Sequence, residues 1–513
     1  MKVELVRGKK PKLEKLIIPV FQEARVLPRE ARLDSILSRM AGRALSGKVF
    51  RGEVGESLLL LHPSPADVGA LVLLGLGPEK KLTLETLRRA AGILARRSTR
   101  ETSTHLALEI DLPPLSAHLS ALGWEKAAQA ITVGWNTGGY VFDAYKSTKK
   151  DPKRAPRLGL FGPSFSAEEA RAVEAGIRAG QVLGDASRVA RDLANTPGND
   201  LYPEKLAEHA RVLARRNGLA VRILHKRDLE REHMGALLGV AQGSDHAPCM
   251  IVLDYRPRRA PKATVVLVGK AVTFDSGGLS IKPAKGMEEM KFDMSGGAIV
   301  LGALQAIASM KPPLRVVGIV PSTENLISGS AMRPGDILRS AAGKTIEVVN
   351  TDAEGRLILA DALHYARKFR PDYMVDFATL TGACLVALGT QVSGLVTNNT
   401  SLGDLVFAAG EACGERVWKL PLYDEFLEAT KSTVADLKNS AGRSGGAITA
   451  AAFLSHFVGK TPWCHVDIAG TAWAERDSGP LVAGATGVGL RLAVEVVSAL
   501  AARPRGARAA DKA

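Results

Sequence analysis

The chain has 513 residues, of which 46% are hydrophobic and 24% are charged. This length exceeds one ordinary hydrophobic core, so two domains are expected, and the composition excludes a disordered or fibrous chain. The net charge is +15, and residues 1–160 carry most of the excess, with 27 Lys and Arg against 16 Asp and Glu.

The N-terminal part alternates apolar runs with helical patterns. Ser57–His62 and Gly69–Gly75 are expected to be strands, and Leu84–Arg97 a helix with an arginine-rich outer face. The charged, proline-containing stretch Lys146–Arg157 has poor periodicity and is expected to connect two domains. A strand at Leu158–Phe161 and a long helix at Ser166–Ala194 follow. We therefore predict a basic α/β domain with its connection over 1–157, a linking strand and helix over 158–195, a catalytic domain over 196–500 and a basic tail over 501–513.

From about Gly218 the pattern changes to strands that alternate with helices. The expected elements are strands at Val221–Leu224, Thr264–Val268, Leu314–Val320, Tyr373–Phe377 and His465–Ile468, and helices at Gly297–Met310 and Arg356–Phe369. Such alternation predicts a largely parallel sheet covered on both faces, in which ligands bind beyond the carboxyl ends of the strands. Polar segments follow two expected strands, at Lys270–Asp275 and at Thr379–Gly382.

The cysteines, the first residues and the charge bear on location and partners. Four widely spaced cysteines form no CxxC pair, which argues against disulfides or a cysteine-bound zinc and fits a reducing cytoplasm. We expect no membrane role, because no signal-peptide centre and no apolar run long enough to cross a bilayer is present. The basic N-terminal part could bind DNA or could simply have a solvated, positively charged surface. The absence of an aromatic-basic pattern favours the solvated surface.

Charged residues gather around glycines in the segment GKAVTFDSGGLSIKPAKGMEEMKFDMSGG, Gly269–Gly297. Asp275 precedes a Ser-Gly-Gly turn, where glycine lets the backbone bend sharply and approach a ligand closely. Lys282 and Asp293 follow in the same segment. These residue types are candidates for binding a ligand or a metal ion.

A second charged segment is NTDAEGRLILADAL, Asn350–Leu363. Asp352, Glu354 and Arg356 occupy alternate positions, and in an extended stretch their side chains would face one side. The apolar periodicity after Gly355 predicts that a helix begins there.

Carboxylates gathered in this way repel one another, and buried charge needs compensation. Divalent cations would supply it, and a carboxylate-rich site without histidine suits Mn or Mg, or Zn where carboxylates bridge two ions. Two ions about 3.5–4 Å apart can hold a water as a nucleophilic hydroxide and polarise a carbonyl. Lys282 and Arg356 would then be cations for a developing oxyanion or an anionic helper.

Spacing alone leaves a metal hydrolase and a phosphate-binding site equally open. The sequence has no HExxH, GxSxG or GxxxxGK[ST] motif, which disfavours a single-zinc peptidase, a serine hydrolase and a phosphate-cradling loop. His364 and His465 fall in apolar patterns, and we expect them to be core or supporting residues and not ligands.

The octapeptide NTDAEGRL, Asn350–Leu357, resembles the signature of the leucine aminopeptidase (cytosol aminopeptidase) family of two-metal exopeptidases. Further blocks resemble that family in the same order: ARDLANTPGNDLYPEKLAEHA, VGKAVTFDSGGLSIKP, KFDMSGG, DFATLTGAC, ADLKNSAGRSGGAITAAAFL and DIAGTAW. The resemblance is strong over about Ala190–Leu500 and weak over residues 1–150. It departs mildly at Gly297 and Ile299, where alanine is common in the family.

The resemblance implies a role for each matching residue. Two metal ions, Mn or Zn, would be bound by Lys270, Asp275, Asp293, Asp352 and Glu354. Asp275 and Glu354 would bridge the ions, and Lys270 would have to be neutral to act as a ligand. Lys282 would polarise the scissile carbonyl, and Arg356 would hold a bicarbonate that acts as general base. The α-amine of the peptide would bind one metal and Asp293, and the pocket for the first side chain would be lined by Met290, Thr379 and Gly382.

The family resemblance also implies a fold, an assembly and an activity. The fold is α/β, with a smaller α/β N-terminal domain and a larger α/β/α catalytic domain around a mixed, largely parallel sheet. The assembly is a cytoplasmic homohexamer that removes N-terminal leucine or other apolar residues from peptides, with a broad preference. Two other functions compete with this one. A DNA-binding role of the N-terminal domain is compatible with aminopeptidase activity. A two-metal phosphoesterase would use the same carboxylates, but it gives no reason for the NTDAEGRL sequence around them.

Overall fold

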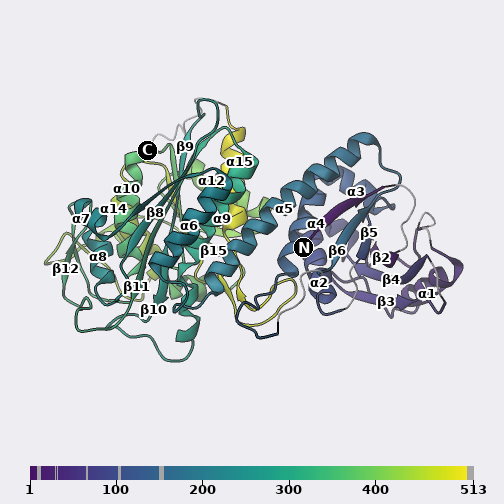
Figure 1. The fold of residues 1–513 in the computed structure, drawn as a ribbon, viewed down its shortest axis with the longest axis horizontal. Coiled ribbons are helices and arrows are strands. Elements are labelled where there is room, and N and C mark those ends of the chain that lie inside the picture. The colour runs from purple at the N-terminus through teal and green to yellow at the C-terminus, as the bar shows by residue number, and fades with distance from the viewer. Residues whose placement is uncertain are drawn as a thin grey trace. The chain divides into compact units, whose positions relative to one another are not determined.

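The computed structural model describes residues 1–7, 13–28, 31, 33–64, 67–101, 105–148 and 155–504. The chain forms two compact units, Met1–Arg188 with Glu475–Ala483 and Val189–Ala474 with Gly484–Ala513 (Figure 1). Residues 149–154 of the predicted connection, and the part of the predicted basic tail beyond residue 504, lie outside the described residues.

The first unit is built on a six-stranded sheet in the order β1-β6-β5-β2-β4-β3. The strands are β1 (Val3–Val6), β2 (Leu13–Val20), β3 (Ser57–Leu61), β4 (Val68–Gly75), β5 (His105–Glu109) and β6 (Arg157–Phe161). Side chains alternate between the faces of a strand, and β2 shows the result. Leu16 and Ile18 share an apolar cluster with α1 (Ser35–Ser46), whereas Ile17 packs with α2 (Leu84–Ser98) and α4 (Trp124–Gly138). Helices therefore cover both faces of this sheet.

The second unit contains a larger sheet in the order β16-β15-β18-β14-β9-β11-β8-β7, with β10 paired to the end of β11. Its strands are β7 (Ala220–Leu224), β8 (Cys249–Tyr255), β9 (Thr264–Gly269), β10 (Ala271–Asp275), β11 (Arg315–Asn325), β14 (Tyr373–Ala378), β15 (Ser393–Thr397), β16 (Val417–Lys419) and β18 (Trp463–Asp467). The strand β8 is antiparallel to both neighbours and β15 is antiparallel to β18, while the other described pairs are parallel. The predicted fold class is therefore confirmed.

Helices cover both faces of the larger sheet (Figure 1). One layer consists of α6 (Pro203–Asn217), α9 (Ser295–Met310), α12 (Thr400–Cys413) and α15 (Leu490–Ala502). The other layer consists of α8 (Gly235–Ala241), α10 (Gly355–Ala366) and α14 (Gly446–Val458). The helical stretch Met287–Met310 is long and apolar enough to cross a membrane, but most of it is buried inside this unit, as expected of a core helix.

The predicted elements differ from the observed ones mainly at their ends. The strand predicted at Leu314–Val320 continues to Asn325, because its polar end pairs with β8 and β10 and is buried. The helix predicted at Arg356–Phe369 ends at Ala366 and continues as a single 3-10 turn, η4 (Arg367–Phe369). The buried strand β8 was not predicted.

Candidate metal centre

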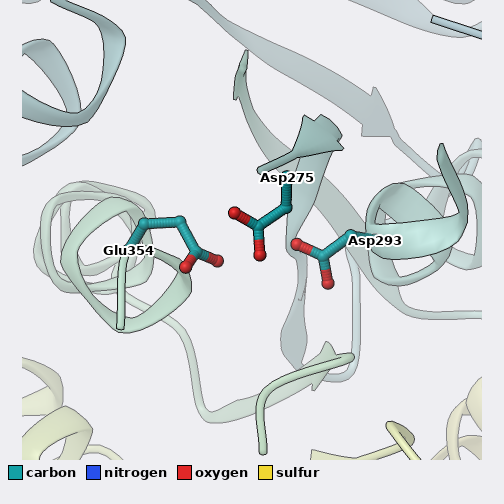
Figure 2. Close-up of side chains that lie close together, drawn as sticks. All are labelled: Asp275, Asp293 and Glu354. Atoms are coloured by element: carbon teal, nitrogen blue, oxygen red, sulfur yellow. The ribbon is translucent and has the colours of Figure 1, made fainter. Parts of the chain in front are cut away.

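Three carboxylates converge at the carboxyl edge of the larger sheet. Asp275 ends β10, Asp293 lies in the 3-10 helix η3 (Met287–Met294), and Glu354 immediately precedes α10. One oxygen of each lies within 4.8 Å of the others, and Figure 2 shows the three groups pointing toward one another. All three residues are buried. A shared cation would compensate their charge, and oxygen donors at this spacing fit a divalent metal ion.

Lys270 follows β9 and is only 2% exposed. Its Nζ lies 2.8 Å from Oδ2 of Asp293 and 2.8 Å from Oε1 of Glu354, and it donates to the carbonyl oxygen of Thr379 at 2.8 Å. Gly355 leaves the space that this side chain occupies, since a Cβ there would lie 2.6 Å from both Cε and Nζ of Lys270. The lysine is therefore held on all sides by the cluster.

Lys282 joins a fourth carboxylate to the cluster. Its Nζ lies 2.8 Å from Oδ2 of Asp275 and 2.5 Å from Oδ1 of Asp352. The other oxygen of Asp275 accepts from the N–H of Gly277 at 2.9 Å, in a turn where Gly277 has a φ of +86°. The predicted use of glycine at this turn is confirmed, because a side chain would be strained at that φ.

Burial and mutual repulsion perturb the ionisation of these groups. Burial raises the pKa of Asp352 and of Glu354, and the carboxylate of Asp275 raises both further. Burial also raises the pKa of Asp293 well above its ordinary value, against the opposing effect of Lys270. Burial lowers the pKa of Lys270, but the carboxylates of Asp293 and Glu354 outweigh it and raise that pKa. Four carboxylates against two ammonium groups leave an excess of negative charge that a divalent cation would neutralise.

The segment that carries Asp352 and Glu354 is not extended. Asp352 lies in a turn, and Glu354 has φ −74° and ψ −36°, which are helical values. The prediction that Asp352, Glu354 and Arg356 share one side of an extended stretch was therefore wrong. The prediction of a helix beginning at this point is confirmed, since α10 starts at Gly355.

Asn439 gives this loop its shape. Its side-chain oxygen accepts from the backbone N–H groups of Val349 at 2.9 Å and Asn350 at 3.3 Å. Its side-chain amide donates to the carbonyl oxygens of Asn350 at 2.6 Å and Ala353 at 3.3 Å. Its own carbonyl oxygen accepts from Nη1 of Arg356 at 2.9 Å. One fully buried residue thus holds the loop before α10 through its side-chain amide and one end of the arginine through its backbone carbonyl.

Asn325 supports the cluster from the end of β11. Its side-chain amide donates to Oδ1 of Asp275 at 2.8 Å and to the carbonyl oxygen of Thr351 at 3.1 Å. Sequence reasoning missed Asn325 and Asn439 as supporting residues. The signal for Asn325 was a polar sequence directly after an apolar strand, whereas Asn439 lay in a block similar to the family without any spacing that pointed to its role.

Arg356 lies in the first turn of α10 and is 8% exposed. Burial lowers its pKa to about 10, against the opposing carboxylates of Glu354 and Asp467, so it remains a cation at neutral pH. Its Nε is buried and has no hydrogen-bond partner within the described part of the chain.

The three predicted pocket residues differ in their surroundings. Thr379 is buried after β14, and its hydroxyl donates to Oδ1 of Asp293 at 2.7 Å. Met290 is half-buried on η3, the element that carries Asp293. Gly382 is exposed at the start of α11 (Gly382–Leu388) and faces open space. Thr379 thus contacts Asp293, Met290 shares its 3-10 helix, and the use of all three residues as a pocket stays a prediction.

Comparison of the whole sequence with known proteins gives a consistent result. Residues 188–494 match the cytosol aminopeptidase family, catalytic domain, and residues 17–149 match the cytosol aminopeptidase family, N-terminal domain. The chain is 45% identical over 483 residues to a probable cytosol aminopeptidase of Geobacter sp. (strain M21), covering 94% of this chain and 96% of the relative. It is 44% identical over 484 residues to that of Chlorobaculum tepidum, covering 90% and 94%.

Solved structures show the same similarity. A mutant of tomato leucine aminopeptidase superposes with a TM-score of 0.85 at 33% identity, covering 97% of this chain and 96% of that one. The bottromycin maturation enzyme BotP in complex with Mn superposes with a TM-score of 0.82 at 33% identity, covering 95% and 100%.

Proposed function

Because the chain belongs to the cytosol aminopeptidase family and is a metal-dependent exopeptidase, we propose that it removes leucine and other apolar residues from the N-termini of cytoplasmic peptides. The observation that carries the proposal is the buried convergence of Asp275, Asp293 and Glu354, paired with two lysines. The names of the relatives support the cytoplasmic location, as do the four buried cysteines, none of which is in a disulfide in the described part of the chain. A homohexameric assembly is proposed from the family resemblance.

Two divalent ions, Mn or Zn, are proposed as cofactors. The ligands would be Lys270, Asp275, Asp293, Asp352 and Glu354. The oxygen spacing supports Asp275, Asp293 and Glu354 as part of this set, and the manganese complex of the similar enzyme BotP supports Mn as a metal. When bound, the ions would supply positive charge that polarises the scissile carbonyl and acidifies a water molecule. Lys270 would give up its proton on metal binding, since an ammonium group has no free electron pair.

The remaining charged residues would act on the peptide and on a proton. Asp293 would accept a hydrogen bond from the α-amine of the substrate, which restricts cleavage to the first residue. Lys282 remains a cation, because the carboxylates around it raise its pKa despite burial, and its ammonium group would donate to the oxyanion. Arg356 would hold a bicarbonate, and the bicarbonate would take a proton from the attacking water. Met290 and Thr379 would form part of the wall beside the first side chain, with Gly382.

Metal removal and one ligand substitution test the proposal. We expect chelation to abolish hydrolysis of leucine p-nitroanilide, and Mn or Zn to restore it. Asp275→Asn should lower kcat/KM by at least about 100-fold, because it removes a charge that faces the metals. Asp404→Asn is a matched control, since Asp404 is an exposed carboxylate that pairs with Lys419 on the surface. Full activity in chelator, or in Asp275→Asn, would reject the proposal.

No finding supports the DNA-binding role considered for the basic N-terminal part, which matches the N-terminal domain of the family. The phosphoesterase alternative lacks support because residues 188–494 match the catalytic domain of an aminopeptidase family. If the protein does not shift duplex DNA in a gel at low salt, the DNA-binding role is excluded. If the metal-loaded enzyme has no phosphatase activity, the phosphoesterase role is excluded.

A further inference from the structure

Asp467 is a buried carboxylate at the end of β18 that is not one of the proposed metal ligands. It is 2% exposed, and its register partner in β14 is Ala378. Its Oδ1 accepts from the backbone N–H groups of Leu380 at 3.2 Å and Ala469 at 3.1 Å. Its Oδ2 accepts from the hydroxyl of Thr381 at 2.7 Å. Two of these three hydrogen bonds therefore reach the loop that follows β14.

The same loop holds two of the proposed metal ligands through Thr379. The carbonyl oxygen of Thr379 accepts from Nζ of Lys270 at 2.8 Å. The hydroxyl of Thr379 donates to Oδ1 of Asp293 at 2.7 Å. All three residues are buried. The position of Thr379 therefore determines where both of these side chains are held.

One peptide group joins the two sets of contacts. The carbonyl of Thr379 and the N–H of Leu380 belong to the same peptide group, which is planar and resists rotation about its C–N bond. Asp467 binds the N–H end and Lys270 binds the carbonyl end, so the peptide cannot turn without breaking both hydrogen bonds. Hydrogen bonds to charged groups are stronger than those between neutral groups. The two charged side chains therefore fix the plane of this peptide.

The carbonyl of Thr379 differs from the other partners of Lys270. Nζ of Lys270 also contacts Asp293 and Glu354, which are both proposed metal ligands. Among the contacts of Nζ in the described chain, the carbonyl oxygen is therefore the acceptor that can orient it without competing with a metal ion. The direction of Nζ then depends on the peptide group that Asp467 holds.

We infer that Asp467 is a positioning residue for the metal centre, which holds the Thr379–Leu380 peptide group and through it orients Lys270 and Asp293 for metal binding. The inference rests on the proposed function, since it takes Lys270 and Asp293 to be ligands. It adds a residue whose effect on metal affinity passes through one backbone N–H group.

A purely structural role for Asp467 is the competing explanation. Thr381 caps the N-terminus of α11, where its hydroxyl accepts from the N–H of Cys384 at 3.1 Å, and Asp467 would then only hold that cap. Three substitutions separate the explanations. Asp467→Ala removes all three hydrogen bonds of the side chain, and Asp467→Asn keeps an oxygen that can accept from Leu380. Thr381→Val removes the hydroxyl of the cap and leaves the contact between Asp467 and Leu380.

The zinc affinity of the full-length apoenzyme, measured by competition with a chelating dye, tests the inference without turnover. We expect Asp467→Ala to weaken at least one zinc-binding step by about tenfold or more, because partners that orient a ligand contribute that much. Asp467→Asn and Thr381→Val should stay within about threefold of the wild type, because each keeps the hydrogen bond to Leu380. The thermal midpoint of each variant establishes that it is folded. Wild-type affinity in Asp467→Ala, or an equally large loss in either other variant, would overturn the inference.

Lys270→Leu separates this inference from the proposed function. If Lys270→Leu binds zinc as the wild type does, the proposed ligand role of Lys270 is wrong. If it loses affinity while Asp467→Ala does not, only the positioning role of Asp467 is wrong.

A crystal structure of the zinc-loaded wild-type enzyme gives a second test that needs no variant. The carbonyl oxygen of Thr379 should lie about 2.7–3.2 Å from Nζ of Lys270 while the N–H of Leu380 still donates to Asp467. A peptide group turned away from either partner would overturn the inference.

Discussion

Replacing Gly355 by alanine tests whether the position of Lys270 determines metal binding. The new Cβ would lie 2.6 Å from Cε and Nζ of Lys270, and ordinary contact begins at 3.4 Å, so the lysine must retreat by 3.4 − 2.6, or about 0.8 Å. Lys270 is 2% exposed, and its Nζ lies 2.8 Å from each of three oxygens, so it cannot move aside into solvent. A misplacement of roughly 1 Å at a reacting centre can cost about 100-fold in rate. We expect that loss in kcat/KM, with metal affinity lowered at least about tenfold.

The assay combines metal content after equilibrium dialysis with kcat/KM on leucine amide. Gly355 has no positive φ and opens a helix, where alanine is ordinarily favoured over glycine by about 1 kcal/mol. Helix propensity and the steric effect on Lys270 therefore predict opposite results. Gly329→Ala is the control, because Gly329 is exposed and nothing lies within 4 Å of its added Cβ. Metal content and kcat/KM within about twofold of the wild type in Gly355→Ala would refute the reasoning.

Three further predictions concern other residues of the catalytic unit. Lys282→Met should lower kcat by about 100- to 1,000-fold while metal content changes little, because the ammonium group of Lys282 would stabilise the oxyanion of the transition state. A parallel loss of metal would show instead that Lys282 is needed for metal binding. Asn439→Ala should lower metal affinity at least about tenfold, measured by competition with a chelating dye, because it removes the hydrogen bonds that hold the loop carrying Asp352 and Glu354. Unchanged affinity would contradict the role of the Asn439 side chain. Asp361 accepts from the N–H groups of Leu237 and Ala341, and burial raises its pKa from 3.8 to about 7. An acid with a raised folded-state pKa binds more protons when folded, so its contribution to stability falls as pH rises from 3.8 to about 7. Asp361→Asn should therefore cost about 1–3 kcal/mol in urea unfolding at pH 5 and less at pH 8; an equal cost at both pH values would contradict this pKa.

Much of the fold could be predicted because buried parallel strands are continuous apolar runs. The strands at Thr264–Gly269 and Tyr373–Ala378 each extend one residue beyond their predicted ends. The end of β11 could not be found in this way, because Ser322–Asn325 are polar residues buried by pairing with β8 and β10 and by hydrogen bonds to the site. Apolar pattern alone cannot distinguish such a strand end from a loop.

The charged residues of the site could be predicted from the sequence, but the residues that hold them in place could not. Two dense clusters and the family resemblance located Asp275 and Glu354, and the structure brings them together. The assignment of Lys270 as a ligand came from the resemblance, since charge alone would keep an ammonium group outside a metal site. Asn439 and His465 each hydrogen-bond to residues 80 or more positions away, and such partners become visible only in three dimensions.

The dependence of the ligand loop on Asn439 has a consequence for protein synthesis. Glu354 leaves the ribosome 439 − 354, or 85, residues ahead of Asn439, an interval of about 4–17 s at roughly 5–20 residues per second. During that time the nascent chain contains the octapeptide but not the side chain that gives it its shape. The strand β18, which lies between β15 and β14 in the sheet, is translated later still. Metal uptake therefore has to follow translation of almost the whole catalytic unit, and polypeptides released before Asn439 should emerge without a formed metal centre.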